Sequence, residues 1–113
     1  MSIHETAIVD PSAQVDKTAS VGAFAPVGEC VWIGPDVILG EGVQVSEYVT
    51  IGKGAHLGKD AKVDETAWVG RDVEIGDRAR VCKGASIRAG VVIEPGVRVT
   101  AESMPKVKRG FGR

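Results

Sequence analysis

A strict six-residue repeat dominates this chain. Stepping by six from Ile3 to Val99 meets seventeen residues, and all are Ile, Leu or Val, although these types supply only 28 of the 113 residues. A second register, from Ala7 to Val97, contains only Ala and Val. The two registers lie two residues apart, so both sets of side chains point to the same side of an extended strand. Each hexad is therefore predicted to be a short strand with one apolar side, followed by a corner.

Glycine marks the predicted corners. Eight glycines directly follow the large aliphatic residue, as Gly40 and Gly52 do, and five stand three residues after it, as Gly42 and Gly54 do. Such positions suit a backbone that needs a positive φ or the close approach of another segment. A strand this short cannot bury its apolar side alone, whereas parallel stacking of successive turns gives a continuous core. The pattern therefore predicts an all-β solenoid of parallel strands.

Segments such as VWIGPDVILGEG (31–42) and VTIGKGAHLGKD (49–60) resemble the hexapeptide-repeat, or transferase hexapeptide, proteins. The resemblance extends over residues 3–103 and implies a single left-handed parallel β-helix in which three hexads close one triangular coil of 18 residues. The chain would then make between five and six coils, with no inserted loop between Ile3 and Val99. The expected organisation is a β-helix at residues 1–103 and a basic tail at residues 104–113.

The tail carries four cations and no acid, namely Lys106, Lys108, Arg109 and Arg113. A basic tail of this kind can bind an anion or a partner, or it can be a solvated terminus. The composition favours the second interpretation, and both are kept as alternatives.

Charge and composition exclude several classes of function. The formal net charge is −1, which excludes a broadly basic nucleic-acid-binding protein. No apolar run approaches membrane-spanning length and no signal-peptide pattern is present, so we expect no membrane insertion and a cytoplasmic location. Cys30 and Cys82 form neither a disulfide framework nor a metal-ligand spacing. A zinc enzyme of the γ-carbonic anhydrase kind would need three histidines, and only His4 and His56 are present, so no metal is expected.

A coil of 18 residues places residues 18 apart in one column, with successive coils about 4.8 Å apart. His56 and Glu74 then share an outward column, where a carboxylate can orient an imidazole as a general base and raise its pKa. The resemblance implies the same role, because acyltransferases of the family commonly use a histidine to deprotonate the acceptor. The alternative is an exposed histidine with an incidental salt-bridging neighbour.

Lys62, Arg80 and Arg98 form a second outward column on the next face. Coenzyme A carries a pyrophosphate and a 3′-phosphate, and a column of cations is suited to bind them. Pairing of these cations with acids of a neighbouring subunit is an equal alternative.

Trp32 and Trp68 are expected to face outward on the third side, with Thr50 between them. Exposed tryptophans in a chain with only 4% aromatic residues favour a subunit interface. Two charged corners support the same view, because in a cyclic assembly one patch meets a different one. The acidic corner contains Glu29, Glu47 and Glu65, and the basic corner contains Lys17, Lys53 and Arg71. The resemblance implies a homotrimer with acyl-CoA bound between subunits.

Two functions follow from these observations. The resemblance implies an acyltransferase that moves an acyl group from acyl-CoA to an amine or hydroxyl of a small molecule, with no covalently bound cofactor. The enzymes of the family usually interrupt their hexads with a loop that builds the acceptor pocket, and this chain has no such interruption between Ile3 and Val99. That departure favours the alternative of a non-catalytic trimeric β-helix that acts as a structural or partner-binding module. Whether the chain is an enzyme is left open by its sequence.

Overall fold

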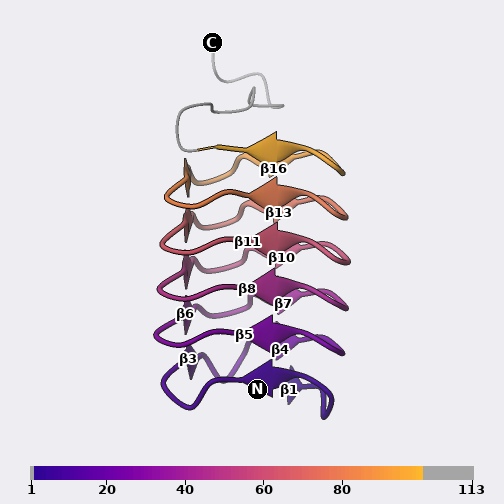
Figure 1. Cartoon of the computed structure of the whole chain (residues 1–113), viewed down its shortest axis with the longest axis vertical. Helices are drawn as coiled ribbons and strands as arrows, with labels where there is room; N and C mark the ends of the chain where they lie inside the picture. Colours follow the sequence, from indigo (N-terminus) through magenta and orange to yellow (C-terminus); the bar gives the residue numbers. More distant parts are fainter. Residues whose placement is uncertain (1, 101–113) are drawn as a thin grey trace.

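The computed structural model describes residues 2–100, which form a left-handed parallel β-helix without helices or inserted loops (Figure 1). Successive coils stack along one axis, and the two ends of the described chain lie at opposite ends of the stack. The predicted fold class is therefore confirmed. Residues 101–103 of the predicted β-helix and the basic tail at residues 104–113 lie outside the described residues, so the division between them stays a prediction.

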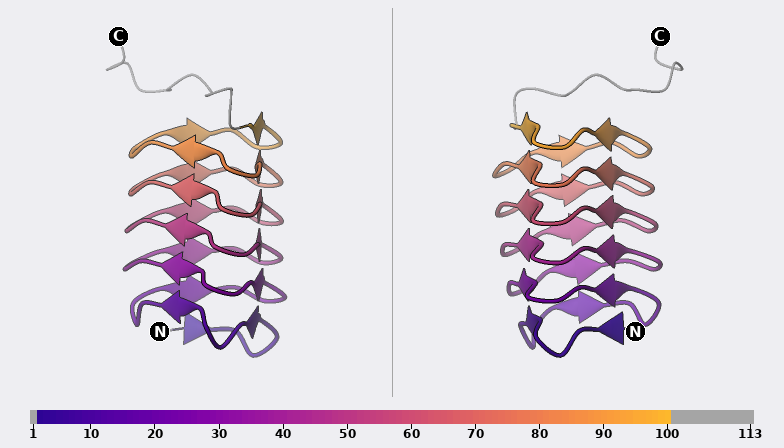
Figure 2. Two further views of the ribbon diagram at one scale, coloured as in Figure 1. Left: turned by 60° about the vertical axis from the view of Figure 1, so that its left-hand side comes forward. Right: turned by 90° about the vertical axis from the view of Figure 1, so that its right-hand side faces the viewer.

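The described chain contains seventeen strands of two residues each, arranged in three parallel sheets on the three sides of the coil (Figure 2). Sheet A consists of β1 (Ser2–Ile3), β4 (Ser20–Val21), β7 (Ile38–Leu39), β10 (His56–Leu57), β13 (Glu74–Ile75) and β16 (Val92–Ile93). Sheet B consists of β2 (Ile8–Val9), β5 (Pro26–Val27), β8 (Gln44–Val45), β11 (Lys62–Val63), β14 (Arg80–Val81) and β17 (Arg98–Val99). Sheet C consists of β3 (Gln14–Val15), β6 (Trp32–Ile33), β9 (Thr50–Ile51), β12 (Trp68–Val69) and β15 (Ser86–Ile87).

Residues 18 apart are partners in every sheet, as Leu57 is with Leu39 in the coil before and Ile75 in the coil after. Three hexads therefore close one coil, as predicted. With three strands to a coil, the described strands make five complete coils and two sides of a sixth.

The two apolar registers fill the interior of the helix. Ile51 from the large register and Ala55 from the small one are both fully buried, and no polar or charged side chain among residues 3–100 is buried. Burying one such aliphatic side chain contributes about 1.5–3 kcal/mol relative to leaving it exposed. Aromatic rings do not enter this narrow interior. All four aromatic residues of the described chain lie outside it, namely Phe24, Trp32, Tyr48 and Trp68.

The corners depend on an unusual backbone conformation. The residue at the corner tip has a positive φ at all thirteen positions from residue 24 to residue 96, and its N–H donates to the coil before it. Gly42 donates to the carbonyl of Ala23 at 2.8 Å, and Tyr48 to that of Glu29 at 3.0 Å. Five of these tips are glycine, as the sequence pattern suggested, but eight carry side chains at φ between 57° and 60°.

The glycines that directly follow a large aliphatic residue have a different role. A Cβ on Gly70 would lie 2.8 Å from the backbone nitrogen of Ala89 and 2.8 Å from the carbonyl oxygen of Ile87. Only glycine leaves room for the next coil at this position, so the close approach inferred from the sequence is confirmed there.

In the first coil, side chains rather than backbone carbonyls accept the hydrogen bonds at the corners. The hydroxyls of Thr6, Ser12 and Thr18 accept the N–H groups of the next coil's corner tips, each at 2.9 Å. The Ser12 and Thr18 hydroxyls in turn donate to the carboxylates of Asp10 and Asp16 at 2.8 and 2.7 Å. Hydroxyl groups thus replace, in the first coil, the backbone carbonyls that accept these bonds in later coils.

Candidate functional site

Sheet A presents His56 and Glu74 side by side. His56 on β10 and Glu74 on β13 are partners in register, and both side chains are exposed on the outer side of the sheet. Leu57 and Ile75, the next residues of the same strands, are buried in the interior. Because successive side chains of a strand point to opposite faces, their burial fixes the outward direction of the polar pair. Within residues 2–100 the two side chains are neighbours without a direct hydrogen bond or ion pair.

A shallow groove of about 550 Å³ follows sheet A over this pair. Ile38 stands one coil before His56 and Val92 one coil after Glu74, so two apolar side chains frame the imidazole and the carboxylate. Sites that hold organic ligands combine an apolar wall with a few polar groups in this way. Ile38 and Val92 were not among the predicted site residues, although the same 18-residue step that joins His56 to Glu74 leads to both.

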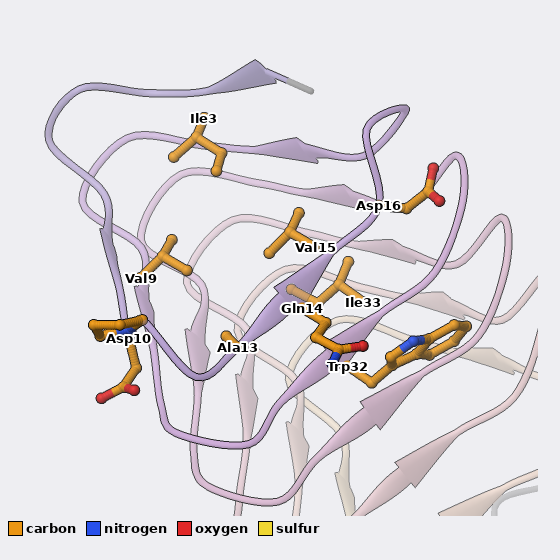
Figure 3. Close-up of a pocket in the computed structure, with 10 residues that line it drawn as sticks. Ile3, Val9, Asp10, Ala13, Gln14, Val15, Asp16, Trp32 and Ile33 are labelled. Carbon is orange, nitrogen blue, oxygen red and sulfur yellow. The ribbon is translucent and has the colours of Figure 1, made fainter.

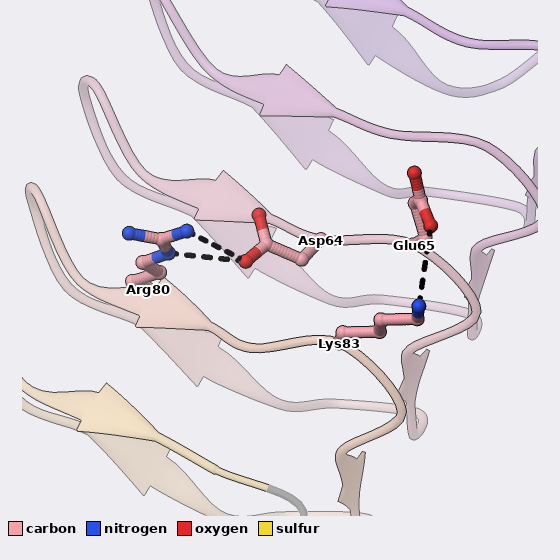
Figure 4. A network of polar contacts seen from close by, with 4 residues as sticks. All are labelled: Asp64, Glu65, Arg80 and Lys83. Atoms are coloured by element: carbon pink, nitrogen blue, oxygen red, sulfur yellow. Dashed lines mark hydrogen bonds and ion pairs between the residues drawn. The ribbon is translucent and has the colours of Figure 1, made fainter.

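Sheet B carries the predicted column of cations. Lys62 pairs in register with Arg80, and Arg80 with Arg98, so the column is confirmed as an arrangement. Arg80 has a partner within its own chain: its Nε and Nη2 donate to Oδ2 of Asp64 at 3.1 and 2.9 Å (Figure 4). Asp64 was not predicted, because its side chain reaches Arg80 from the preceding coil. Within residues 2–100 no acid lies in ion-pair range of Lys62 or Arg98.

The His56 column and the cation column lie on different sides of the prism. The corner between β10 and β11 separates them, and adjacent sheets face different directions (Figure 2). A ligand that touched both columns of one copy would have to bend over this corner. The structure therefore confirms each column but does not bring the two together on one surface.

Sheet C carries both tryptophans. Trp32, Thr50 and Trp68 are successive partners in register, and the exposed fractions of Trp32 and Trp68 are 43% and 46%. The corner that precedes sheet C bears the acidic stack, and the corner that follows it bears Lys53 and Arg71. Lys17 does not stack on Lys53 as predicted, because Pro35 occupies the coil between them.

Another hollow lies at the amino-terminal end of the stack (Figure 3). It measures about 580 Å³ and opens onto the inward side chains of the first coil, among them Ile3, Val9 and Val15. None of the described residues that line it is basic or nucleophilic: its polar groups are Asp10, Asp16 and the Gln14 amide, with the Trp32 indole at the rim. This hollow is the uncovered end of the apolar interior rather than a catalytic arrangement.

The described residues give less support to a disulfide or a metal site. Cys30 and Cys82 are free thiols. Among the described residues, no three or more His, Cys, Asp and Glu side chains come together in a group that could hold a metal ion. Residues 2–100 also include no helix with the length and apolar character needed to span a membrane.

Comparison with solved structures relates the fold to known proteins. No protein-family model and no curated protein sequence matches the chain. GDP-perosamine N-acetyl transferase from Caulobacter crescentus, solved as a histidine-to-alanine variant with CoA and GDP-perosamine, matches with a TM-score of 0.83 and 26% identity. The match covers 90% of this chain and 50% of that one. The acetyltransferase domain of PglB from Neisseria gonorrhoeae, in complex with acetyl coenzyme A, matches with a TM-score of 0.81. Its identity of 21%, over 90% of this chain and 52% of that one, shows the fold alone.

This chain spans about half the length of these two neighbours. Their activities and ligands are therefore properties of longer proteins. What they share with this chain is the three-sided helix of hexapeptide coils, which here continues without interruption over the described residues. The six-residue repeat and the left-handed parallel coils make this chain a hexapeptide-repeat β-helix, the fold that it shares with the perosamine enzyme.

Proposed function

We propose that this chain acts in the transfer of an acyl group from acyl-CoA to an amine or hydroxyl of a small molecule. The observation that carries the proposal is the groove over sheet A, where His56 and Glu74 stand side by side between apolar residues. The CoA complex of the perosamine enzyme, which shares the β-helix at 26% identity, supports it. Acyl-CoA is the co-substrate in this proposal, and no covalently bound cofactor is needed.

The proposed reaction assigns one role to each of the two polar residues. The His56 imidazole accepts the proton of the acceptor's amine or hydroxyl as the acceptor attacks the thioester carbonyl. The carbon–sulfur bond then breaks, the acyl group stays on the acceptor, and the departing CoA thiolate takes the proton from His56. Glu74 stands one coil away in the same outward column, where its carboxylate lies beside the ring that carries the proton during transfer.

The cations of sheet B are proposed to hold the phosphates of CoA. Lys62 and Arg98 have no acidic partner among residues 2–100, so their charges are available to an anion. Arg80 is held by Asp64 through two nitrogens, which fixes its guanidinium on the outer side of the sheet but offsets part of its charge. We therefore assign the larger share of phosphate binding to Lys62 and Arg98.

A homotrimer is the assembly that we propose for this function. Within one copy, a ligand could contact both the His56 groove and the cation column only by bending over the corner between them. Neighbouring copies arranged in a ring can place the groove of one beside the cation column of the next. A cytoplasmic location is also proposed, because unpaired cysteines such as Cys30 and Cys82 are usual in a reducing compartment.

The test is thiol release from acetyl-CoA in the presence of small amines and amino sugars. We expect His56→Ala to abolish acceptor-dependent release while the circular dichroism spectrum and melting temperature stay those of the wild type. His4→Ala is the matched control, because His4 lies at a first-coil corner and should leave release unchanged. Equal release by the wild type and His56→Ala would overturn the role of His56.

A structural or partner-binding module is the second candidate function. The observation that favours it is the shallow, open shape of the groove, since the uninterrupted coils supply no loop to cover a bound acceptor. The two candidates differ in acetyl-CoA binding, which the first requires and the second does not.

A further inference from the structure

The lining of the groove over sheet A is almost wholly apolar. Among the described residues that line it, the polar side chains are His56, Glu74 and Glu94, and the others are aliphatic residues, proline and glycine. No lysine, arginine, side-chain amide or hydroxyl is among these lining residues. Burying a polar group without a hydrogen-bond partner is costly, so this lining suits a ligand whose surface is mainly apolar.

A nucleotide-linked amino sugar is poorly matched to such a lining. Its phosphates need cations or several N–H donors, and its sugar hydroxyls need polar partners in number. The cations Lys62 and Arg80 stand on sheet B, beyond the corner that bounds sheet A in the same copy. The described lining of the groove therefore disfavours an acceptor that carries phosphate.

Glu74 sets the sign of the charge beside His56. The two residues are register partners, and Glu74 has no ion pair within residues 2–100. An ammonium group on the ligand complements this carboxylate, whereas a carboxylate or phosphate on the ligand is repelled by it. The Glu74 side chain is exposed, so the attraction is modest and apolar contact has to supply the rest of the affinity.

Val92 supplies that contact on the far side of Glu74. His56, Glu74 and Val92 follow one another in a single outward column, at steps of about 4.8 Å. Pro95, at the corner after β16, lines the same end of the groove. A ligand whose nitrogen lies at Glu74 therefore has the imidazole one coil away in one direction and an apolar surface one coil away in the other.

We propose that the groove over sheet A binds a small apolar amine without phosphate groups, with its nitrogen beside His56 and Glu74 and its hydrocarbon body over Val92 and Pro95. As a statement about the acceptor, this inference rests on the proposed function and narrows its acceptor class to such amines. As a statement about the groove, it rests on the lining residues alone.

An amine that binds in its ammonium form carries one proton more than the transfer requires. That proton leaves to solvent before the neutral amine attacks the thioester carbonyl. The nitrogen–carbon bond then forms, the carbon–sulfur bond breaks, and the next proton of the nitrogen passes through His56 to the CoA thiolate. Each turnover thus yields an amide, CoA thiol and one proton in solution, whereas transfer to a hydroxyl would release no proton.

Matched probes test the groove in the absence of CoA. Phenylethylamine has the amine and an apolar body, phenylpropionate has a similar body with the opposite charge, and ethanolamine has the amine without the body. In protein labelled at the valine methyl groups, phenylethylamine should shift the Val92 signals and bind at least about fivefold more tightly than either other probe. Equal or weaker binding of phenylethylamine, or no binding at all, would overturn the proposal.

Two variants assign the two contacts. Glu74→Lys should reverse the charge preference, so that phenylpropionate binds more tightly than phenylethylamine. Val92→Ser should weaken phenylethylamine binding about fivefold and leave ethanolamine binding unchanged. Ser20→Ala is the matched control, because Ser20 lies in the same outward column two coils before His56 and outside the groove. A Glu74→Lys protein that is folded and still prefers the amine would contradict the assignment.

Turnover separates this inference from the proposed function. With acetyl-CoA, phenylethylamine should support faster thiol release than glucosamine phosphate, with one proton released for each thiol. Faster release with glucosamine phosphate would overturn the acceptor class and leave the transferase function standing. Binding of phenylethylamine at Val92 without thiol release from any acceptor would overturn the transferase function and still support the ligand class of the groove.

Discussion

The interior of the helix and its outer columns share one backbone but follow different rules. In strand β10 the inward residue Leu57 is 2% exposed, while its outward neighbour His56 is open to solvent. Inward positions are restricted to small and branched aliphatic residues in every coil. Outward positions change from coil to coil, so that sheet A carries an imidazole and a carboxylate and sheet C carries indoles. Stability and surface chemistry are therefore set by alternate residues, and each should be alterable without the other.

The largest effect is expected from the interior half of β10. Leu57 is buried in a wholly apolar core, so Leu57→Ala removes apolar contacts and leaves a cavity there. The substitution should lower the free energy of unfolding by about 2–5 kcal/mol. His56→Ala, one residue away on the outer side, should change it by less than about 0.5 kcal/mol. Urea denaturation of both variants measures the contrast. Equal losses would show that the outward column is part of the core after all.

A smaller loss is expected where two coils approach each other. The Cβ of Gly70→Ala would meet the backbone of the next coil at 2.8 Å, which cannot yield as a side chain can. We expect a loss of about 1–3 kcal/mol, in the range of overpacked cores. Ser86→Ala is the matched outward control on β15, the strand that approaches Gly70, and should be nearly neutral. A fully stable Gly70→Ala variant would contradict the close stacking of the coils.

The sequence predicted the repeat and the columns because both depend only on spacing. The 18-residue step placed His56 beside Glu74 and Lys62 beside Arg80, and the structure confirms both placements. The same step leads to Ile38 and Val92, which were not predicted because a possible catalytic pair is recognised by its polar side chains, whereas an apolar wall has no such signal. The sequence therefore predicted the polar pair on sheet A but not the groove that surrounds it.

Three other features could not be obtained from spacing. The contact between Asp64 and Arg80 depends on how far a side chain reaches between coils. The positive φ of corner tips such as Tyr48 and Thr66 is imposed by closure of the coil rather than by the preference of the residue itself. The hydroxyl corners of the first coil do recur at the six-residue step, at Thr6, Ser12 and Thr18, but spacing alone does not show that these hydroxyls accept the N–H groups of the next coil.

The smallest effect is expected from pH at the first-coil corners. Hydrogen bonds from the backbone and the hydroxyl of Ser12 hold the pKa of Asp10 below its ordinary value of 3.8. The hydroxyl and backbone of Thr18 do the same for the pKa of Asp16. A carboxylate whose pKa is lower in the folded state stabilises that state above its ordinary pKa, and the stabilisation is lost as pH falls through the lower folded value.

Melting temperatures of the wild type and of the Asp10→Asn, Asp16→Asn variant should therefore converge as pH falls from neutral to below 3.8. Thermal denaturation followed by circular dichroism measures the convergence. Asp60→Asn serves as the control. Asp60 lies at a later corner, where its backbone N–H donates to the backbone carbonyl of Glu41. A constant difference at all pH values would show that the two aspartates do not stabilise the first coil through their charge.

Titration of acetyl-CoA against the assembled protein, followed by calorimetry, tests the central claim that the outer columns of sheets A and B form an acyl-CoA site. We expect binding in the micromolar range that Lys62→Ala and Arg98→Ala each weaken and that Ser86→Ala, on sheet C, leaves unchanged. Arg80→Ala should weaken it less, because Asp64 already offsets part of that charge. Absence of any binding heat at millimolar acetyl-CoA, with the protein folded and assembled, would contradict the claim and leave the chain as a structural module.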